Sequence, residues 1–145
     1  PSLSKKPHTR FGYTLDPEFF LYQHYSGIHL LNNAKLVFGS GRVYKKSGSD
    51  NVYVFAISNR LTIFERVIPF FRKYVLPFSE KYSWFDTYVY IVESLLRKDH
   101  LEVHSFINLI KLTYSLNPYS TSGKGKERKI PLDILCNDCL LYTSD

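Results

Sequence analysis

Residues Gly39–Asn59 read GSGRVYKKSGSDNVYVFAISN and decide the predicted fold. Arg42–Lys46 and Val52–Ser58 are strand candidates, because apolar or aromatic residues recur along both at strand spacing. Ser47–Asn51 separates them and consists of residues that tolerate positive φ or hydrogen-bond their own backbone, which predicts a tight reversal. The stretch therefore predicts a β-hairpin. A basic, aromatic ribbon of this width suits a nucleic-acid groove, and an ordinary amphipathic hairpin is the alternative.

Alternation along the second strand separates two apolar sets. Tyr53, Phe55 and Ile57 share one face, which we expect to pack against helices together with Phe19, Leu21 and Val43. The opposite face carries Val52, Val54 and Ala56. These three side chains lack hydrogen-bonding groups, so they would read little base sequence, although they would suit contact with a protein.

Outside the hairpin, the periodicity predicts a long strand and several helices. Pro17 interrupts the strand candidate Tyr13–His24 and marks a bulge or an edge. Gly39 is the expected left-handed end of one helix, Asn59 and Asp99 are expected N-caps, and Pro69 is expected to stop or restart a helix. The predicted helices are Ile28–Phe38, a helix from about Arg60 through Ile68, about Ser79–Lys98, and Asp99–Leu116.

Charge is concentrated toward the two ends of the chain. The net charge of the 145 residues is +6, with eight Lys or Arg against three acids in residues 1–60 and four against one in residues 118–129. This distribution favours a polyanionic partner, and a solvated basic surface is the alternative. No apolar run approaches the roughly 20 residues of a membrane span, so we expect no membrane partner.

These patterns predict an α+β protein in which helices cover one face of an antiparallel sheet. We expect a basic N-terminal arm over residues 1–12, one domain over residues 13–117 and a flexible basic tail over residues 118–145. The sequence starts at Pro1 and contains no Met, so we expect a processed, trimmed or incomplete start. Cys139–Asp145, CLLYTSD, resembles the translation of a sequencing adapter, and we infer no function from it.

Four segments in order resemble the LAGLIDADG homing endonucleases and maturases over roughly residues 12–118. Gly12–His24 resembles the family's second strand, and Ile28–Tyr44 resembles the helix, glycine turn and third strand that follow it. Asn51–Phe71 resembles the fourth strand and next helix, and Asp99–Pro118 resembles the last helix. The resemblance implies a LAGLIDADG-like half domain of order αββαββα, whose saddle-shaped antiparallel sheet lies along nucleic acid and is covered on its other face by helices.

The family's signature motif is absent from residues 1–12, upstream of the segment that resembles the second strand. In the family, that motif forms a helix that packs the two halves together and carries an acidic metal ligand. Cleavage of DNA needs carboxylates that hold a divalent ion, yet residues 1–12 contain no acid, and Asp16 and Glu18 do not match the motif. The resemblance therefore implies no catalytic residue, no metal ligand and no cofactor here, with Mg²⁺ relevant only if the chain is an active endonuclease.

Two other patterns are weak candidates for metal sites. His100 and His104 are spaced i, i+4 without an obvious third ligand, so a solvated helix face is the simpler interpretation. Cys136 and Cys139 form half of a zinc ribbon at best.

Two functions from different classes are consistent with the sequence. We favour a non-catalytic, RNA-binding protein derived from a LAGLIDADG homing endonuclease, as a structural component of a mitochondrial ribosome or another organellar ribonucleoprotein. The alternative is a homing endonuclease or intron maturase whose motif helix lies outside this sequence, and a third possibility is a protein-binding scaffold. The mitochondrial location follows from the family's usual residence in organellar introns.

The expected partners are RNA, ribosomal RNA in particular, ahead of DNA, together with neighbouring proteins of a large assembly. Basic side chains are expected to contact phosphates, and two tyrosines are expected to stack on unpaired bases. The candidate contact residues are Lys5, Lys6, Arg10, Tyr22, Arg42, Tyr44, Lys45, Lys46, Lys124, Lys126, Arg128 and Lys129.

Overall fold

The computed structural model describes residues 2–6, 8–116 and 132–141. The chain divides into two compact units, each described by itself below: unit 1 is Pro1–Asp16 with Lys81–Asp145, and unit 2 is Pro17–Glu80. The predicted boundaries after residues 12 and 117 do not coincide with these units. Among the described helices, none combines the length and the apolar character that a membrane span requires.

Unit 1 is a hairpin packed with helices. Its first strand lies inside the predicted basic arm and pairs antiparallel with the second, Ser2 opposite Asp16 and Lys5 opposite Tyr13. Residues 1–12 are therefore not a simple arm, because the backbone of their first part is hydrogen-bonded in a ladder. The elements of unit 1 are β1 (Ser2–Lys5), β2 (Tyr13–Asp16), α4 (Tyr82–Leu96), α5 (Val103–Leu116) and α6 (Leu132–Leu141).

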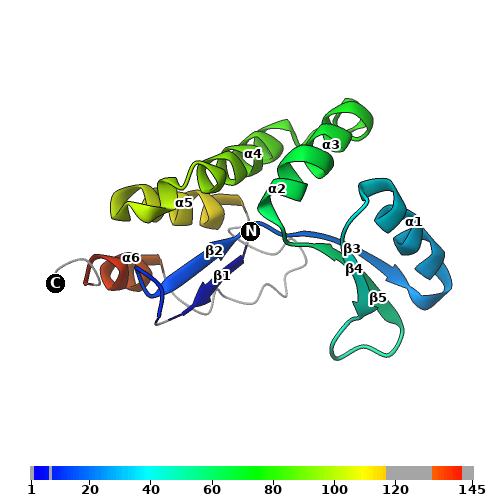
Figure 1. Ribbon diagram of the computed structural model, residues 1–145, viewed down its shortest axis with the longest axis horizontal. Helices are drawn as coiled ribbons and strands as arrows, with labels where there is room; N and C mark the ends of the chain where they lie inside the picture. Colours follow the sequence, from blue (N-terminus) through cyan, green and yellow to red (C-terminus); the bar gives the residue numbers. More distant parts are fainter. Residues whose placement is uncertain (1, 7, 117–131, 142–145) are drawn as a thin grey trace. The chain divides into compact units, whose positions relative to one another are not determined.

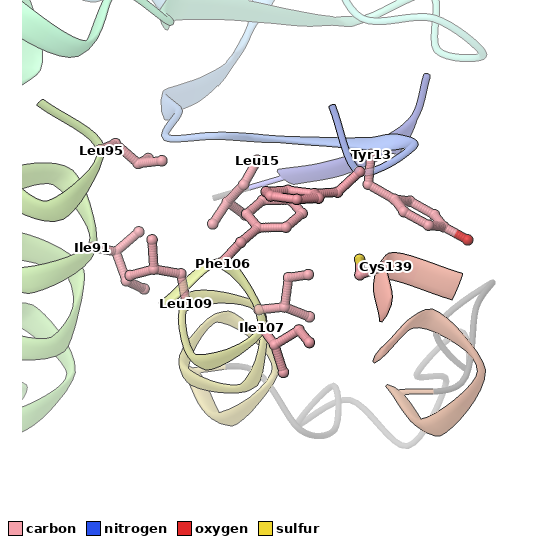
Figure 2. Packing of buried hydrophobic residues seen from close by; sticks show 10 residues of the cluster. Tyr13, Leu15, Ile91, Leu95, Phe106, Ile107, Leu109 and Cys139 are labelled. Atoms are coloured by element: carbon pink, nitrogen blue, oxygen red, sulfur yellow. The ribbon is translucent and has the colours of Figure 1, made fainter. Parts of the chain in front are cut away.

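The core of unit 1 joins the hairpin to its helices. Figure 2 shows Tyr13 and Leu15 of β2 near buried side chains of α5, among them Phe106. The Phe11 and Phe106 rings stack with centroids 5.4 Å apart. Cys139 of α6 is also buried in this cluster, and burial raises the pKa of its thiol to about 11. The predicted flexible tail thus contains a helix that packs on the core.

Helix α5 starts later than predicted. The Glu102 carboxylate caps it by accepting hydrogen bonds from the N–H groups of His104 (3.0 Å) and Ser105 (2.7 Å), and these bonds lower the pKa of Glu102. Asp99, the predicted cap, instead lies in a 3₁₀ turn and pairs with Arg97 at 3.1 Å. His100 belongs to the same turn, so it does not share a helix face with His104.

Unit 2 contains a three-stranded antiparallel sheet of β3 (Phe19–His24), β5 (Val52–Ile57) and β4 (Arg42–Lys45), in that spatial order. The predicted hairpin is therefore confirmed, with β5 in the centre. The predicted single strand Tyr13–His24 is divided at Pro17: its first part pairs with β1 and its second part pairs with β5. Proline has no N–H to donate to a ladder, which explains why pairing ends there.

Helix α1 (Ile28–Phe38) has the predicted bounds and lies beside the sheet of unit 2 (Figure 1). Its Phe38 ring stacks on Phe55 of β5 with centroids 6.2 Å apart, and Phe19 of β3 meets both rings edge-on. Phe55 and Ile57 are buried, whereas Phe19, Leu21 and Val43 are half-buried on the same face. The predicted strand alternation is confirmed.

The helix after β5 continues through Pro69 and neither stops nor restarts there. The Asn59 side chain caps its first turn by accepting from the Thr62 N–H at 2.9 Å, as predicted. The helix consists of α2 (Arg60–Thr62), a π turn (Ile63–Val67) and α3 (Ile68–Tyr74). The wider π turn precedes the proline ring, where a regular helix would bring that ring against the carbonyl one turn earlier.

Gly41 allows the backbone just before β4 to pass close to Phe55 of β5. Its φ is +105°, and a Cβ atom at this position would lie 2.5 Å from the Phe55 ring. Both the backbone conformation and the space therefore require glycine.

Truncation of Phe55 to Ala should lower the free energy of unfolding by about 3–5 kcal/mol, because a fully buried ring is replaced by a cavity. Phe78→Ala is the matched control, since that ring is 89% exposed and its loss should change stability by less than about 0.5 kcal/mol. Urea unfolding of both variants measures the difference. Equal losses would contradict the assignment of Phe55 to the core.

The variant Gly41→Ala should be less stable than Gly48→Ala. Both glycines have positive φ, but a Cβ atom at Gly48 would meet nothing within 4 Å. Both variants therefore carry backbone strain of about 1–2 kcal/mol, and Gly41→Ala adds a clash with Phe55. Thermal unfolding measures the difference, and equal midpoints would show that β4 can move away from Phe55 at no cost.

Candidate nucleic-acid interface

The sheet of unit 2 has one face turned away from Phe38 of α1, here called the open face. The antiparallel register places nine side chains on it in three rows. The last row is fixed by the hydrogen bond from the Lys46 N–H to the Val52 carbonyl at 2.8 Å. The rows are Phe20–Ala56–Arg42, Tyr22–Val54–Tyr44 and His24–Val52–Lys46.

Two of the three side chains in the central column of the open face are buried. Val54 and Ala56 are buried, although the sequence predicted an exposed apolar face on this strand. Val54 lies between Tyr22 and Tyr44, and Ala56 lies between larger side chains on both sides. Of the three β5 side chains on this face only Val52 is partly exposed, so most of the accessible surface belongs to the two outer strands.

Two cations lie over the two tyrosines of the middle row. The Arg42 guanidinium carbon is 5.3 Å from the centroid of the Tyr44 ring on the same strand. The Lys46 Nζ is 5.4 Å from the centroid of the Tyr22 ring, so the lysine side chain reaches across β5. Both distances are within the range of cation–π attraction. The open face thus presents positive charge held against aromatic rings.

The structure brings four predicted contact residues together, namely Tyr22, Arg42, Tyr44 and Lys46. It places Lys45 on the opposite face, in register with Tyr53, and Lys45 pairs with Asp50 at 3.5 Å. This placement corrects the expectation that Lys45 lies with Arg42 and Lys46, because successive side chains of a strand point to opposite faces.

The other predicted contact residues do not belong to the open face. Lys5, Lys6 and Arg10 are part of unit 1, where they lie in β1 and in the loop that follows it. Arg10 also has a structural role, since its guanidinium donates a hydrogen bond to the Leu101 carbonyl at 3.1 Å. Lys124, Lys126, Arg128 and Lys129 lie outside the described residues.

Two members of the open face on the outer strand β3 are absent from the candidates predicted from sequence. Phe20 and His24 share it with Tyr22 because they are two positions away on the same strand, so strand alternation contained the signal. The His24 ring is engaged locally: its Nδ1 lies 3.0 Å from the Ser26 hydroxyl, and its ring centroid lies 4.3 Å from that of Tyr25.

Metal ligands do not gather within the part of the chain that the structure describes. Residues 2–6, 8–116 and 132–141 contain no group of three or more His, Cys, Asp or Glu side chains placed to hold an ion. The described residues therefore do not fit the divalent-metal site that the resemblance associates with DNA cleavage, and we derive no metal-dependent step.

The sequence matches known proteins across the open face and beyond it. The family model described as LAGLIDADG endonuclease matches residues 2–92. The DNA endonuclease I-CeuI of Chlamydomonas moewusii is 36% identical over 111 residues, which are 75% of this chain and 51% of that protein. The chain thus spans about half the length of this curated relative.

Solved structures of homing endonucleases share the fold. The group I intron-encoded homing endonuclease I-CeuI, complexed with DNA, matches with a TM-score of 0.84 and 29% identity over 95% of this chain and 67% of that chain. The archaeal intron-encoded homing endonuclease I-Vdi141I, also complexed with DNA, has a TM-score of 0.84 and 26% identity over 97% of this chain and 85% of that chain. The predicted α+β fold is confirmed, and the chain belongs to the LAGLIDADG endonuclease family.

Proposed function

We propose that unit 2 binds the major groove of duplex DNA through its open face, as the DNA-contacting part of a LAGLIDADG homing endonuclease. The observation that carries this proposal is the placement of Arg42 and Lys46 on one sheet face that contains no acid. Three strands about 4.8 Å apart span roughly 10 Å, which is compatible with a B-DNA major groove about 12 Å wide. The family membership and the DNA complexes of similar proteins support the same partner.

Duplex DNA suits this face better than the unpaired RNA that the sequence led us to expect. Proteins that bind unpaired bases stack them on open aromatic faces. The rings of Tyr22 and Tyr44 each have a cation over one face, which leaves less ring surface for a base. Moreover, side chains do not read the deep, narrow major groove of an RNA helix. A structural role in an organellar ribonucleoprotein and residence in a mitochondrion stay predictions from the family resemblance.

Affinity for duplex DNA should fall steeply with salt, and Lys46→Ala should flatten the log–log slope by about 0.9 if Lys46 neutralises one phosphate. The control Lys45→Ala removes the same charge from the opposite face and should change the slope less. Fluorescence anisotropy over a salt series measures both, with single-stranded RNA of matching sequence as the competitor. Tighter binding of the RNA, or affinity that ignores salt, would contradict the proposal.

The 145-residue chain should bind duplex DNA in Mg²⁺ without cutting it. This expectation has two grounds. The His, Cys, Asp and Glu side chains of the described residues form no group that could hold a metal ion, and residues 1–12 contain no acid. Incubation with a library of duplex targets, followed by sequencing of the ends, is the measurement. Double-strand breaks at a defined sequence would show that this chain is itself an endonuclease.

A further inference from the structure

The open face has an unusual chemical composition for a surface that contacts base edges. Its nine side chains, all of them described, comprise one arginine, one lysine, one histidine, two tyrosines and four hydrocarbon side chains. None of the nine is an acid or an amide. The one amide side chain within β3, that of Gln23, lies in register with Tyr53 on the opposite face.

This composition limits which bases the face can read directly. Asn and Gln read adenine through paired hydrogen bonds, and Asp and Glu accept from the amino group of cytosine. Both kinds of side chain are missing from the nine. Arg and Lys donate to the O6 and N7 atoms of guanine, and hydrocarbon side chains contact the thymine methyl group. We propose that Arg42 reads a guanine in the major groove and is the specificity-determining residue of unit 2.

The surroundings of Arg42 hold it in a position suited to that role. Gly41 brings the start of β4 close to Phe55, so the backbone of the arginine is fixed against the core. In register across the ladder lies Ala56, which is buried, so Arg42 extends beyond the short side chain of its neighbour on β5. The guanidinium lies over the Tyr44 ring, which limits its freedom while the hydrogen-bond donors at its edge stay available. Among the described residues, no carboxylate pairs with Arg42.

Lys46 differs from Arg42 in the chemistry it offers. Its ammonium group is a point charge without a planar fork, so it attracts phosphates and guanine alike and enforces less geometry. Lys45 supplies a control for charge alone, because it lies on the same strand but on the opposite face and pairs with Asp50. The substitution Arg42→Lys keeps the charge of the open face and removes the fork.

The inference rests on the proposed binding of duplex DNA, and its test separates the two. The 145-residue chain is mixed with a randomised duplex DNA library, and the bound molecules are sequenced. We expect a selected motif with one position at which guanine is preferred roughly 5- to 150-fold, the range expected for one bidentate contact. Arg42→Ala should abolish that preference, Arg42→Lys should reduce it while duplex binding persists, and Lys45→Ala should leave it unchanged.

A motif that Arg42→Ala and Arg42→Lys select unchanged would overturn the inference and leave DNA binding by unit 2 standing. Duplex binding by the unaltered chain with no selected base would also overturn it. A chain that retains no duplex DNA would remove both proposals. Thermal unfolding of each variant shows whether it is folded, and Arg42→Lys decides the outcome if Arg42→Ala does not fold.

Discussion

Strand β5 is the element on which unit 2 depends, because it is hydrogen-bonded along both edges and carries buried side chains on both faces. Phe55 packs toward α1, and Val54 lies under the side chains of the outer strands on the other face. A strand in this position cannot shift by one residue without exchanging the two sets of side chains. The registers of β3 and β4, and hence the positions of the residues on the open face, are fixed by this burial.

The features that the sequence predicts correctly depend on neighbouring residues, whereas several of those that it misses depend on contacts between distant segments of the chain. The hairpin, the end of α1 at Gly39 and the cap at Asn59 depend on neighbouring residues, and the sequence predicted all three. An interruption at Pro17 was also predicted, but the separate partners of the two halves were not, since these depend on whether each half finds β1 or β5. Alternation from Arg42 already placed Lys45 on the other face, so this error in the candidate site was avoidable. The reach of Lys46 to Tyr22 follows only from the folded sheet.

The cation–tyrosine pairs link the composition of the chain to its proposed partner. A basic, tyrosine-rich sequence is compatible with stacking on unpaired bases and with contacts to a duplex, so composition alone favoured a polyanionic partner without deciding between RNA and DNA. In the folded sheet, the tyrosines support cations above a buried apolar strand. That arrangement directs positive charge toward a groove and uses part of the aromatic surface that stacking requires.

The π turn at Ile63–Val67 affects how this helix can vary in length. Its closing hydrogen bond runs from the Ile68 N–H to the Ile63 carbonyl, five residues back, so one turn contains an additional residue. Ile63, Val67 and Ile68 are all buried, so residues at both ends of the turn contribute to the core. Loss of one residue here would restore a regular helix and would keep the residues after it, including Phe70 and Phe71, on the face that meets Phe19 and Phe38. In a regular helix the same loss would rotate everything after it by about 100°, so the π turn is the place where this helix best tolerates a shorter sequence.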